Sequence, residues 1–211
     1  MKITVYSSKG SAGKTPISAN IAFDRSYALG TNEPFNVLED VFDDDQVMSV
    51  AADDEFPVLP PEIDIVFDLA GSISRHAHSI TSAIRQSDLV IVPVYNDFKS
   101  RKSAIGTILE IEPLTQSILV VATKLQAQKG EFIKDWRKSR DFVQIERDIR
   151  ANIETPYPIL PLKFSKGFDT IFDREMSLKR VTETDPLLAH SFRDVTRQFE
   201  AIYAHMDQVK S

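Results

Sequence analysis

This chain of 211 residues is 42% hydrophobic and 27% charged, with a formal net charge of -6 at pH 7. This composition is typical of a globular protein rather than a disordered one, and we expect residues 1–211 to form a single domain. The absence of cysteine excludes disulfides and thiolate metal sites and is compatible with a cytoplasmic location. No apolar run reaches the length of about 18 residues that a membrane span requires, and the start of the chain has no signal-peptide pattern. Because the net charge is negative, DNA binding requires a local basic patch.

The start of the chain predicts a loop that binds phosphate. Apolar residues 3–6 indicate a strand, residues 7–15 form a loop with two glycines and two lysines, and residues 16–29 are compatible with a helix that Gly30 stops. This order of strand, loop and helix is typical of a P-loop, in which successive backbone N–H groups make a nest for anions. Pro16 fits the first turn of the helix, whose positive end then points at the phosphates.

Four residues of this loop have expected chemical roles. We expect Gly10 and Gly13 to supply the backbone freedom that the nest requires. Lys14 is expected to reach the β- and γ-phosphates of a nucleotide, and the Thr15 hydroxyl to take one position on a Mg²⁺ ion. The alternative interpretation is an ordinary turn that contains glycine.

The general P-loop pattern is not met, because Ser8 stands at its first glycine position. A narrower pattern is met, because a second lysine, Lys9, stands five residues before Lys14. With this pair of lysines the loop resembles the deviant Walker A sequence, K-G-G-x-G-K-[ST], of the ParA/MinD family of P-loop ATPases. It departs from that sequence at Ser11, where the family has glycine. Pro16, the residue after the motif, stands where the family has Thr or Ser.

The resemblance implies a fold, a ligand and a mechanism. The implied fold is α/β, with a doubly wound, mostly parallel sheet flanked by helices. The implied activity is a weak, Mg²⁺-dependent and partner-stimulated ATPase, whose ATP-bound form is a homodimer in which Lys9 contacts the partner's nucleotide. The residues expected at the nucleotide belong to this loop or end two later strands: Lys9, Gly10, Ser11, Ala12, Gly13, Lys14, Thr15, Pro16, Lys124 and Pro161.

A run of three aspartates begins at Asp43 and follows residues 35–42, which are interpreted as the second strand. The run resembles the family's second motif, h-h-D-x-D-P-Q, where h is apolar. On this alignment Asp43 orients the attacking water. Glu39 or Asp40 takes that role if the strand ends earlier, and a solvated acidic turn is the alternative. The proline-rich stretch that follows predicts a short strand over residues 56–59.

The second strong signal is the apolar run over residues 63–67, which delivers Asp68 and then a glycine. A buried parallel strand presents a carboxylate in this way at its carboxyl end. We expect Asp68 to hold Mg²⁺ through water as the Walker B acid, and residues 69–74 to form a switch loop that senses the γ-phosphate. Residues 68–74 are similar to the family's D-G-A-G-S-L-S variant.

The rest of the chain alternates between strand and helix signals. We expect strands over residues 87–94, 117–124 and 157–161, and helices up to residue 86, over 99–111 and 131–153, up to residue 174, and over 188–209. The apolar repeat of the last helix has three interpretations: packing on the sheet, a partner helix, or a membrane anchor, which interspersed acids disfavour.

Basic residues give weaker signals. Lys99, Arg101 and Lys102 form either a spot that faces DNA or a partner, or ordinary exposed charge at a helix start. The charged helix over residues 131–153 is interpreted as a solvated face, because acids are interleaved with its cations. The resemblance implies contacts with non-specific DNA at Lys163, Lys166, Lys179 and Arg180.

We therefore predict a small ParA-like ATPase that dimerises on ATP, binds non-specific DNA and drives segregation of a plasmid or other cargo. A centromere-binding protein or cargo adaptor would stimulate the hydrolysis that resets it, and DNA binding would place it on the nucleoid. One alternative is an accessory ATPase for conjugation or protein positioning. Another is a nucleotide-binding interaction module that hydrolyses ATP poorly.

Overall fold

The computed structural model describes residues 1–34, 37–71 and 78–210. In these residues seven strands form one sheet in the order β3-β2-β4-β1-β5-β6-β7, and every pair of neighbours is parallel. The strands are β1 (Lys2–Val5), β2 (Ala28–Thr31), β3 (Val47–Ser49), β4 (Ile65–Asp68), β5 (Leu89–Val94), β6 (Ile118–Leu125) and β7 (Ile159–Lys163). The helices are α1 (Lys14–Arg25), α2 (His78–Arg85), α3 (Phe98–Ile111), α4 (Arg140–Asn152), α5 (Gly167–Arg174), α6 (Leu178–Thr184) and α7 (Pro186–Lys210), with short 3-10 turns η1 (Val37–Asp40) and η2 (Trp136–Lys138).

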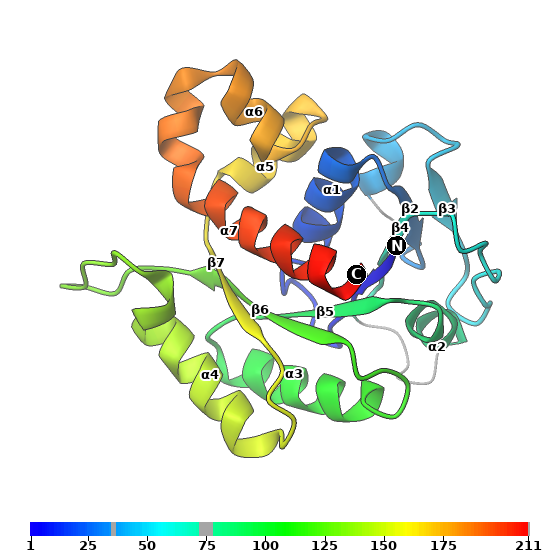
Figure 1. Ribbon diagram of the computed structural model, residues 1–211, viewed down its shortest axis with the longest axis horizontal. Helices are drawn as coiled ribbons and strands as arrows, with labels where there is room; N and C mark the ends of the chain where they lie inside the picture. The colour runs from blue at the N-terminus through cyan, green and yellow to red at the C-terminus, as the bar shows by residue number, and fades with distance from the viewer. Residues whose placement is uncertain (35–36, 72–77, 211) are drawn as a thin grey trace.

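Helices cover both faces of the sheet (Figure 1). One core lies between the sheet and α1, α5, α6 and α7, and the other lies between the sheet and α2, α3 and α4. Strands β4 and β5 are buried along their whole length, as parallel strands covered on both sides must be. The predicted doubly wound α/β sheet is confirmed.

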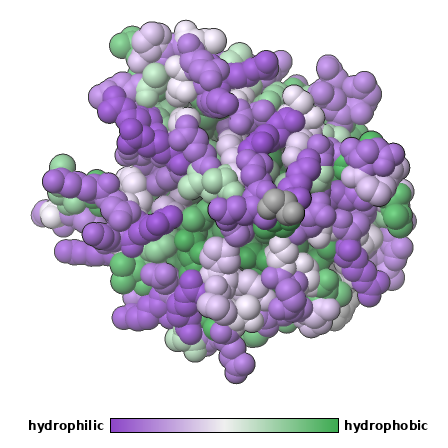
Figure 2. Space-filling model, viewed as in Figure 1, coloured by the Kyte–Doolittle hydropathy of each residue, from purple (hydrophilic) through white to green (hydrophobic). Residues whose placement is uncertain are grey.

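The last helix, α7, packs on the sheet. Its apolar repeat is buried in the first core, where Val195 and Ile202 are fully inaccessible and Phe199 is nearly so. Hydrophilic side chains dominate the outer surface where α6 and α7 meet in the upper left of Figure 2. In the described part of the chain no helix is long and apolar enough to cross a membrane.

The second strand is not where the sequence indicates it. Helix α1 ends at Arg25 because Ser26 adopts the left-handed conformation, with φ of 55°, and β2 begins at Ala28, inside the segment predicted as helix. Gly30 lies inside β2 and does not stop a helix. A Cβ atom there would lie 2.6 Å from the ring of Phe67 on the neighbouring strand β4, so a glycine permits this close packing.

The two further strands predicted before β4 are wrong. Within residues 35–42, residues 35–36 lie outside the described part of the chain, and the next four form η1, which buries Leu38. No strand forms over residues 56–59, where Phe56 instead packs edge-on against Phe67 with 4.8 Å between ring centroids. The strand at this edge of the sheet is β3.

The later elements agree more closely with the sequence. Helix α4 is shorter than predicted, because η2 and a serine cap precede it: the Ser139 hydroxyl accepts a hydrogen bond from the backbone N–H of Phe142. Helix α6, which the sequence did not indicate, begins with the same device, since the Ser177 hydroxyl accepts from the N–H of Arg180. Such caps satisfy backbone donors that have no partner within the helix.

Candidate nucleotide-binding site

The loop between β1 and α1 lies at the carboxyl edge of the sheet and has two left-handed residues, Ser11 with φ of 60° and Gly13 with φ of 90°. Gly13 thus has a backbone conformation that favours glycine, as the sequence predicts. The expectation for Gly10 is wrong, because its φ is not positive, and Ser11 makes the second left-handed turn instead. A residue with a Cβ atom pays about 1–2 kcal/mol for this conformation, so the loop carries local strain at the position where the family sequence has glycine.

Side chains from two other elements fix the loop. The Thr123 hydroxyl on β6 donates a hydrogen bond to the carbonyl oxygen of Ala12 at 2.8 Å. The Ser8 hydroxyl lies 2.7 Å from the Ser103 hydroxyl and 2.9 Å from the Thr107 hydroxyl, both on α3. The side chain at the first glycine position of a general P-loop is therefore used here to attach the loop to α3.

Gly71, three residues after β4, lies directly against the loop. A Cβ atom at this position would lie 2.7 Å from the carbonyl oxygen of Ser7 and 3.1 Å from that of Lys9. Because the contacting atoms are backbone, no rotation of a side chain would relieve the overlap. A glycine after the Asp68 strand is thus required by close approach of two backbones.

Asp68 is buried beneath the loop and accepts two hydrogen bonds from α1. The Thr15 hydroxyl donates to Oδ2 at 2.7 Å and the Ser18 hydroxyl donates to Oδ1 at 2.9 Å. Burial raises the pKa of Asp68 to about 6, against the opposing effects of these two bonds and the charge of Lys14. A carboxylate and a hydroxyl at one point are the oxygen ligands that Mg²⁺ prefers, so Thr15 and Asp68 fit the expected metal.

A cavity of about 370 Å³ opens beside these residues, a volume suited to a small-molecule ligand. Lys124 reaches it from β6, where a shift of strand register accompanies the left-handed φ of 54° of this residue. The Lys124 ammonium lies 5.1 Å from the ring centroid of Tyr95. The residues that line the cavity come from the loop, α1 and three strand ends: Gly10, Ser11, Gly13, Lys14, Thr15, Pro16, Glu33, Gly71 and Lys124.

Three of the residues expected at the nucleotide lie outside this lining. Ala12 is buried behind the loop, Pro161 is buried in β7 opposite Ala122, and Lys9 is half-exposed beyond the cavity. Of the expected switch loop, residues 72–74 lie outside the described part of the chain.

The position of Asp43 does not suit the role expected for it. This exposed residue begins a turn in which its carbonyl oxygen accepts from the N–H of Gln46, whose own carbonyl accepts from Leu29. The turn therefore precedes β3 at the amino end of the sheet, opposite the P-loop. The alternatives Glu39 and Asp40 do not line the cavity either, and Glu39 accepts a hydrogen bond from Ser49.

The acid that does line the cavity is Glu33, two residues after the end of β2. Its charge acts on Asp68, whose pKa it raises. Once β2 is placed, residues 29–34, Leu-Gly-Thr-Asn-Glu-Pro, align with h-h-D-x-D-P: Thr31 replaces the first acid and Glu33 the second. The Glu-Pro pair is the signal that sequence reasoning missed.

Asn32 holds the turn that carries Glu33. Its Oδ1 accepts a hydrogen bond from the N–H of Ala70 at 2.7 Å, and its Nδ2 donates to the Ser79 hydroxyl of α2 at 2.8 Å. Asn32 is buried, so both bonds are shielded from water. They join the ends of β2 and β4 and the start of α2 on one side of the cavity.

The basic residues expected to contact DNA lie on β7 and the helices that follow it. The ammonium of Lys163 is 3.4 Å from the Asp194 carboxylate and 5.7 Å from the ring centroid of Trp136, so an internal acid already compensates its charge. Lys166, Lys179 and Arg180 are exposed. None of the four lines the cavity.

Comparison with known proteins gives a structural answer only. No protein-family model matches this sequence, and no curated protein matches it. Among solved structures, apo McdA of Cyanothece is similar at 12% identity with a TM-score of 0.67, covering 97% of this chain and 98% of McdA. The cell division ATPase MinD of Pyrococcus furiosus is similar at 13% identity with a TM-score of 0.59, covering 95% of this chain and 99% of MinD.

A plasmid partition protein of Borrelia burgdorferi, bound to AMPPNP, is similar at 12% identity with a TM-score of 0.54, covering 94% of this chain and 98% of that one. The likeness extends along almost the whole chain in each case. The chain therefore has the fold of ParA/MinD-type P-loop ATPases, as its two lysines predicted.

Proposed function

We propose that this protein is a ParA/MinD-type ATPase that binds Mg²⁺-ATP in the cavity and uses slow hydrolysis as the switch of a positioning system. The observation that supports this best is that Lys14, Thr15 and Glu33 line one cavity at the carboxyl edge of the sheet, with Asp68 buried directly beneath and bonded to Thr15. In open α/β sheets, ligands bind at this edge.

Each of these residues has a distinct task in the proposal. The N–H groups of the loop and the Lys14 ammonium bind the phosphates. The Thr15 hydroxyl and the Asp68 carboxylate hold Mg²⁺, which when bound neutralises charge on the β- and γ-phosphates. Glu33 orients the attacking water, a task that requires a carboxylate within reach of the γ-phosphate. We assign this role to Glu33 in place of Asp43.

The proposal includes an ATP-dependent homodimer. Lys9 lies beyond the cavity of its own subunit and is half-exposed, which is compatible with a contact to the nucleotide of the partner subunit. If the γ-phosphate joins two subunits, its loss removes the contacts that favour the dimer, and hydrolysis resets the switch. An adaptor protein on the cargo, a plasmid or another body, would stimulate that step.

The proposal also includes binding to non-specific DNA. Lys166, Lys179 and Arg180 are better candidates than Lys163, because no acid compensates them as Asp194 compensates Lys163 among the described residues. An accessory role in conjugation or protein positioning uses the same switch. It differs in retaining the ATP-dependent dimer while binding DNA weakly.

A second candidate function is a nucleotide-binding interaction module that hydrolyses ATP poorly. Two observations favour it: Ser11 is strained where the family sequence has glycine, and Thr31 stands where the second motif has its first acid. In this module the cavity binds ATP, and the bound nucleotide alone selects the partner.

One experiment tests both candidates. ATP affinity, ATP turnover and molecular mass by light scattering are measured for the wild type with ATP and with ADP, each with and without non-specific DNA. A dimer that needs ATP, together with slow turnover, is the expected result. ATP binding without turnover would favour the module, and no binding of either nucleotide would contradict both.

A further inference from the structure

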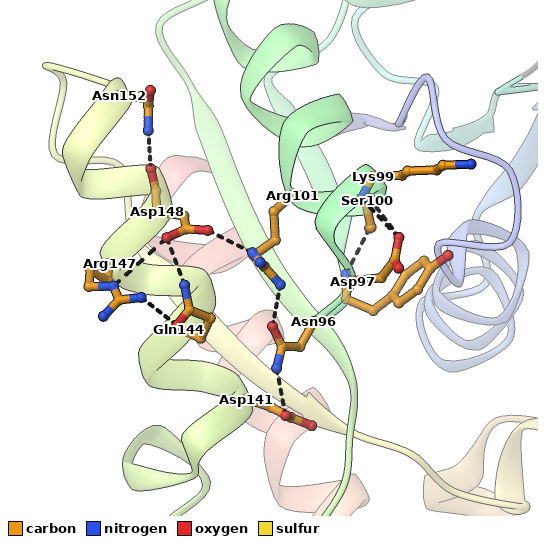
Figure 3. Close-up of polar contacts among 11 residues, drawn as sticks. Asn96, Asp97, Lys99, Ser100, Arg101, Asp141, Gln144, Arg147, Asp148 and Asn152 are labelled. Carbon is orange, nitrogen blue, oxygen red and sulfur yellow. Dashed lines mark hydrogen bonds and ion pairs between the residues drawn. The ribbon is translucent and has the colours of Figure 1, made fainter.

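The start of α3 carries three cations, Lys99, Arg101 and Lys102, which the sequence suggested as one basic spot. Their surroundings in the structure differ (Figure 3). The Arg101 guanidinium donates to Asp148 on α4 at 2.7 Å and to Asn96 before α3. Lys102 and Arg101 line a small cavity of about 190 Å³ between α3 and α4. Lys99 takes part in neither arrangement.

Lys99 lies on the face of α3 that contacts the P-loop. Positions 99, 103 and 107 are spaced by four residues, so they share one face of the helix. On this face the Ser103 and Thr107 hydroxyls contact the Ser8 hydroxyl, and Thr107 also accepts from the Ser8 backbone N–H at 3.2 Å. Figure 3 shows the Lys99 side chain extended away from Arg101 and toward the N-terminal segment, drawn in blue.

This geometry brings Lys99 within reach of Lys9. A rise of about 6 Å separates Lys99 from Ser103 along α3, and Lys9 follows Ser8 directly, about 3.8 Å away between Cα atoms. Both lysines have flexible four-carbon stems, so their ammonium groups can contact one anion. Neither ammonium has an ion pair or hydrogen bond to any residue that the structure describes.

We propose that Lys99 is a second nucleotide-binding cation that acts beside Lys9 on the triphosphate of the ATP held by the partner subunit. Neither Lys9 nor Lys99 lines the cavity of its own subunit, and Lys99 is exposed and Lys9 half-exposed, so both ammonium groups are accessible to a nucleotide held by another subunit. Two ammonium groups suit the dense negative charge of a triphosphate better than one. The inference rests on the proposed ATP-dependent dimer and adds a residue to its interface.

The test compares Lys99→Ala with Lys102→Ala, a matched control on the same helix that faces α4. Lys99→Ala should weaken ATP-dependent dimerisation about tenfold or more, measured by sedimentation velocity over a range of protein concentrations. Its ATP affinity as a monomer should stay within about twofold of the wild type, because the cavity is unchanged. Lys102→Ala should dimerise normally, and Lys99→Arg should retain most of the dimerisation.

A double mutant separates a shared anion from independent effects. If Lys9 and Lys99 bind the same triphosphate, Lys9→Ala and Lys99→Ala together should cost less than the product of the two separate losses. If Lys9→Ala abolishes the dimer while Lys99→Ala leaves it intact, the inference is wrong and the ATPase proposal stands. A loss confined to DNA affinity would also overturn it, by making Lys99 a DNA contact. A wild type that does not dimerise with ATP would contradict the proposed dimer itself.

Discussion

The two sides of the nucleotide cavity are built differently. On the side of β1 and β4, Asp68 is buried and accepts hydrogen bonds from Thr15 and Ser18, so its place is fixed before any ligand binds. On the side of β2, Glu33 is half-exposed and its turn is held through the neighbouring Asn32. In the proposed function, ATP binding therefore depends on residues fixed by the core, whereas hydrolysis depends on Glu33, a half-exposed side chain that can be replaced while Asn32 keeps its two buried hydrogen bonds.

The sharpest test of this comparison is to change the peripheral acid alone. Glu33→Gln should reduce single-turnover ATP hydrolysis about 100-fold, because an amide cannot take a proton from the attacking water. ATP affinity, measured by calorimetry, should change less than about twofold, since the P-loop keeps its contacts. Equal losses in binding and hydrolysis would show that the two sides of the cavity do not act separately.

On the binding side, Lys14→Ala should lower ATP affinity about 30-fold, because it removes a charge-assisted contact to the phosphates. Lys138→Ala, which removes an exposed lysine of η2 that does not line the cavity, is the control and should bind ATP normally. Both affinities can be measured by competition with a fluorescent nucleotide. Unchanged ATP affinity in Lys14→Ala would show that Lys14 of the P-loop does not contact the nucleotide.

The contact of Gly71 with the loop predicts a loss of stability. In Gly71→Ala the new Cβ meets backbone atoms of Ser7 and Lys9, so the loop must shift, and the free energy of unfolding should fall by about 1–3 kcal/mol. Gly106→Ala is the matched control, because a Cβ there enters open space on α3 and should stabilise the helix by up to about 1 kcal/mol. Urea unfolding measures both, and equal values would mean that Gly71 has room.

The raised pKa of Asp68 predicts a pH dependence with a definite sign. The folded-state pKa of about 6 exceeds the unfolded value, so the ionised carboxylate destabilises the metal-free protein, and stability is lost as pH rises from about 4 to about 6. Without divalent cation, Asp68→Asn should be more stable than the wild type above pH 6 by up to about 2 kcal/mol. This advantage should shrink as pH falls toward about 4.

Metal binding should show the opposite trend, because Mg²⁺ needs the ionised carboxylate. The affinity of the wild type for Mg²⁺-ATP should fall by up to about tenfold for each pH unit below 6, and that of Asp68→Asn should be weak and flat over the same range. A wild type with no pH dependence near 6 would show that Asp68 does not hold the metal.

The smallest effect is expected for Asp43, which lies at the amino ends of the strands, opposite the P-loop. Asp43→Asn should leave hydrolysis and ATP affinity within about twofold of the wild type, because the turn that contains Asp43 precedes β3, away from the cavity. The same turnover assay as for Glu33→Gln measures this variant. A strong loss of hydrolysis in Asp43→Asn would return the water-orienting role to this residue.

The elements that could be predicted from the sequence have local signals. Strands β4, β5 and β6 are continuous apolar runs because helices cover both faces. The P-loop could be predicted because its signal, the spacing of Lys9, Gly13 and Lys14, lies within a few residues of sequence. The position of Lys124 at the cavity could also be predicted, because it stands near the carboxyl end of a clearly apolar strand.

The residues that could not be predicted depend on partners distant in sequence. Strand β2 has only four residues, and its glycine is explained by the ring of Phe67, which no local pattern reveals. The run of acids that begins at Asp43 resembles the family motif more closely than the segment around Glu33 does. Residue type alone therefore favoured a residue at the amino ends of the strands, away from the cavity. Ser11 was expected at the nucleotide, but its left-handed backbone could not be predicted, because residues other than glycine rarely adopt that conformation.

The central place of β1 has a consequence for synthesis. This strand is near the start of the chain, yet its neighbours are β4 and β5, and the cavity also needs Lys124. On the ribosome, the P-loop emerges long before the strands and helices that hold it, and such non-local pairing is slow to form. If the cavity binds ATP as proposed, ATP can therefore stabilise only nascent chains in which Lys124 has already been made, which is more than half of the sequence.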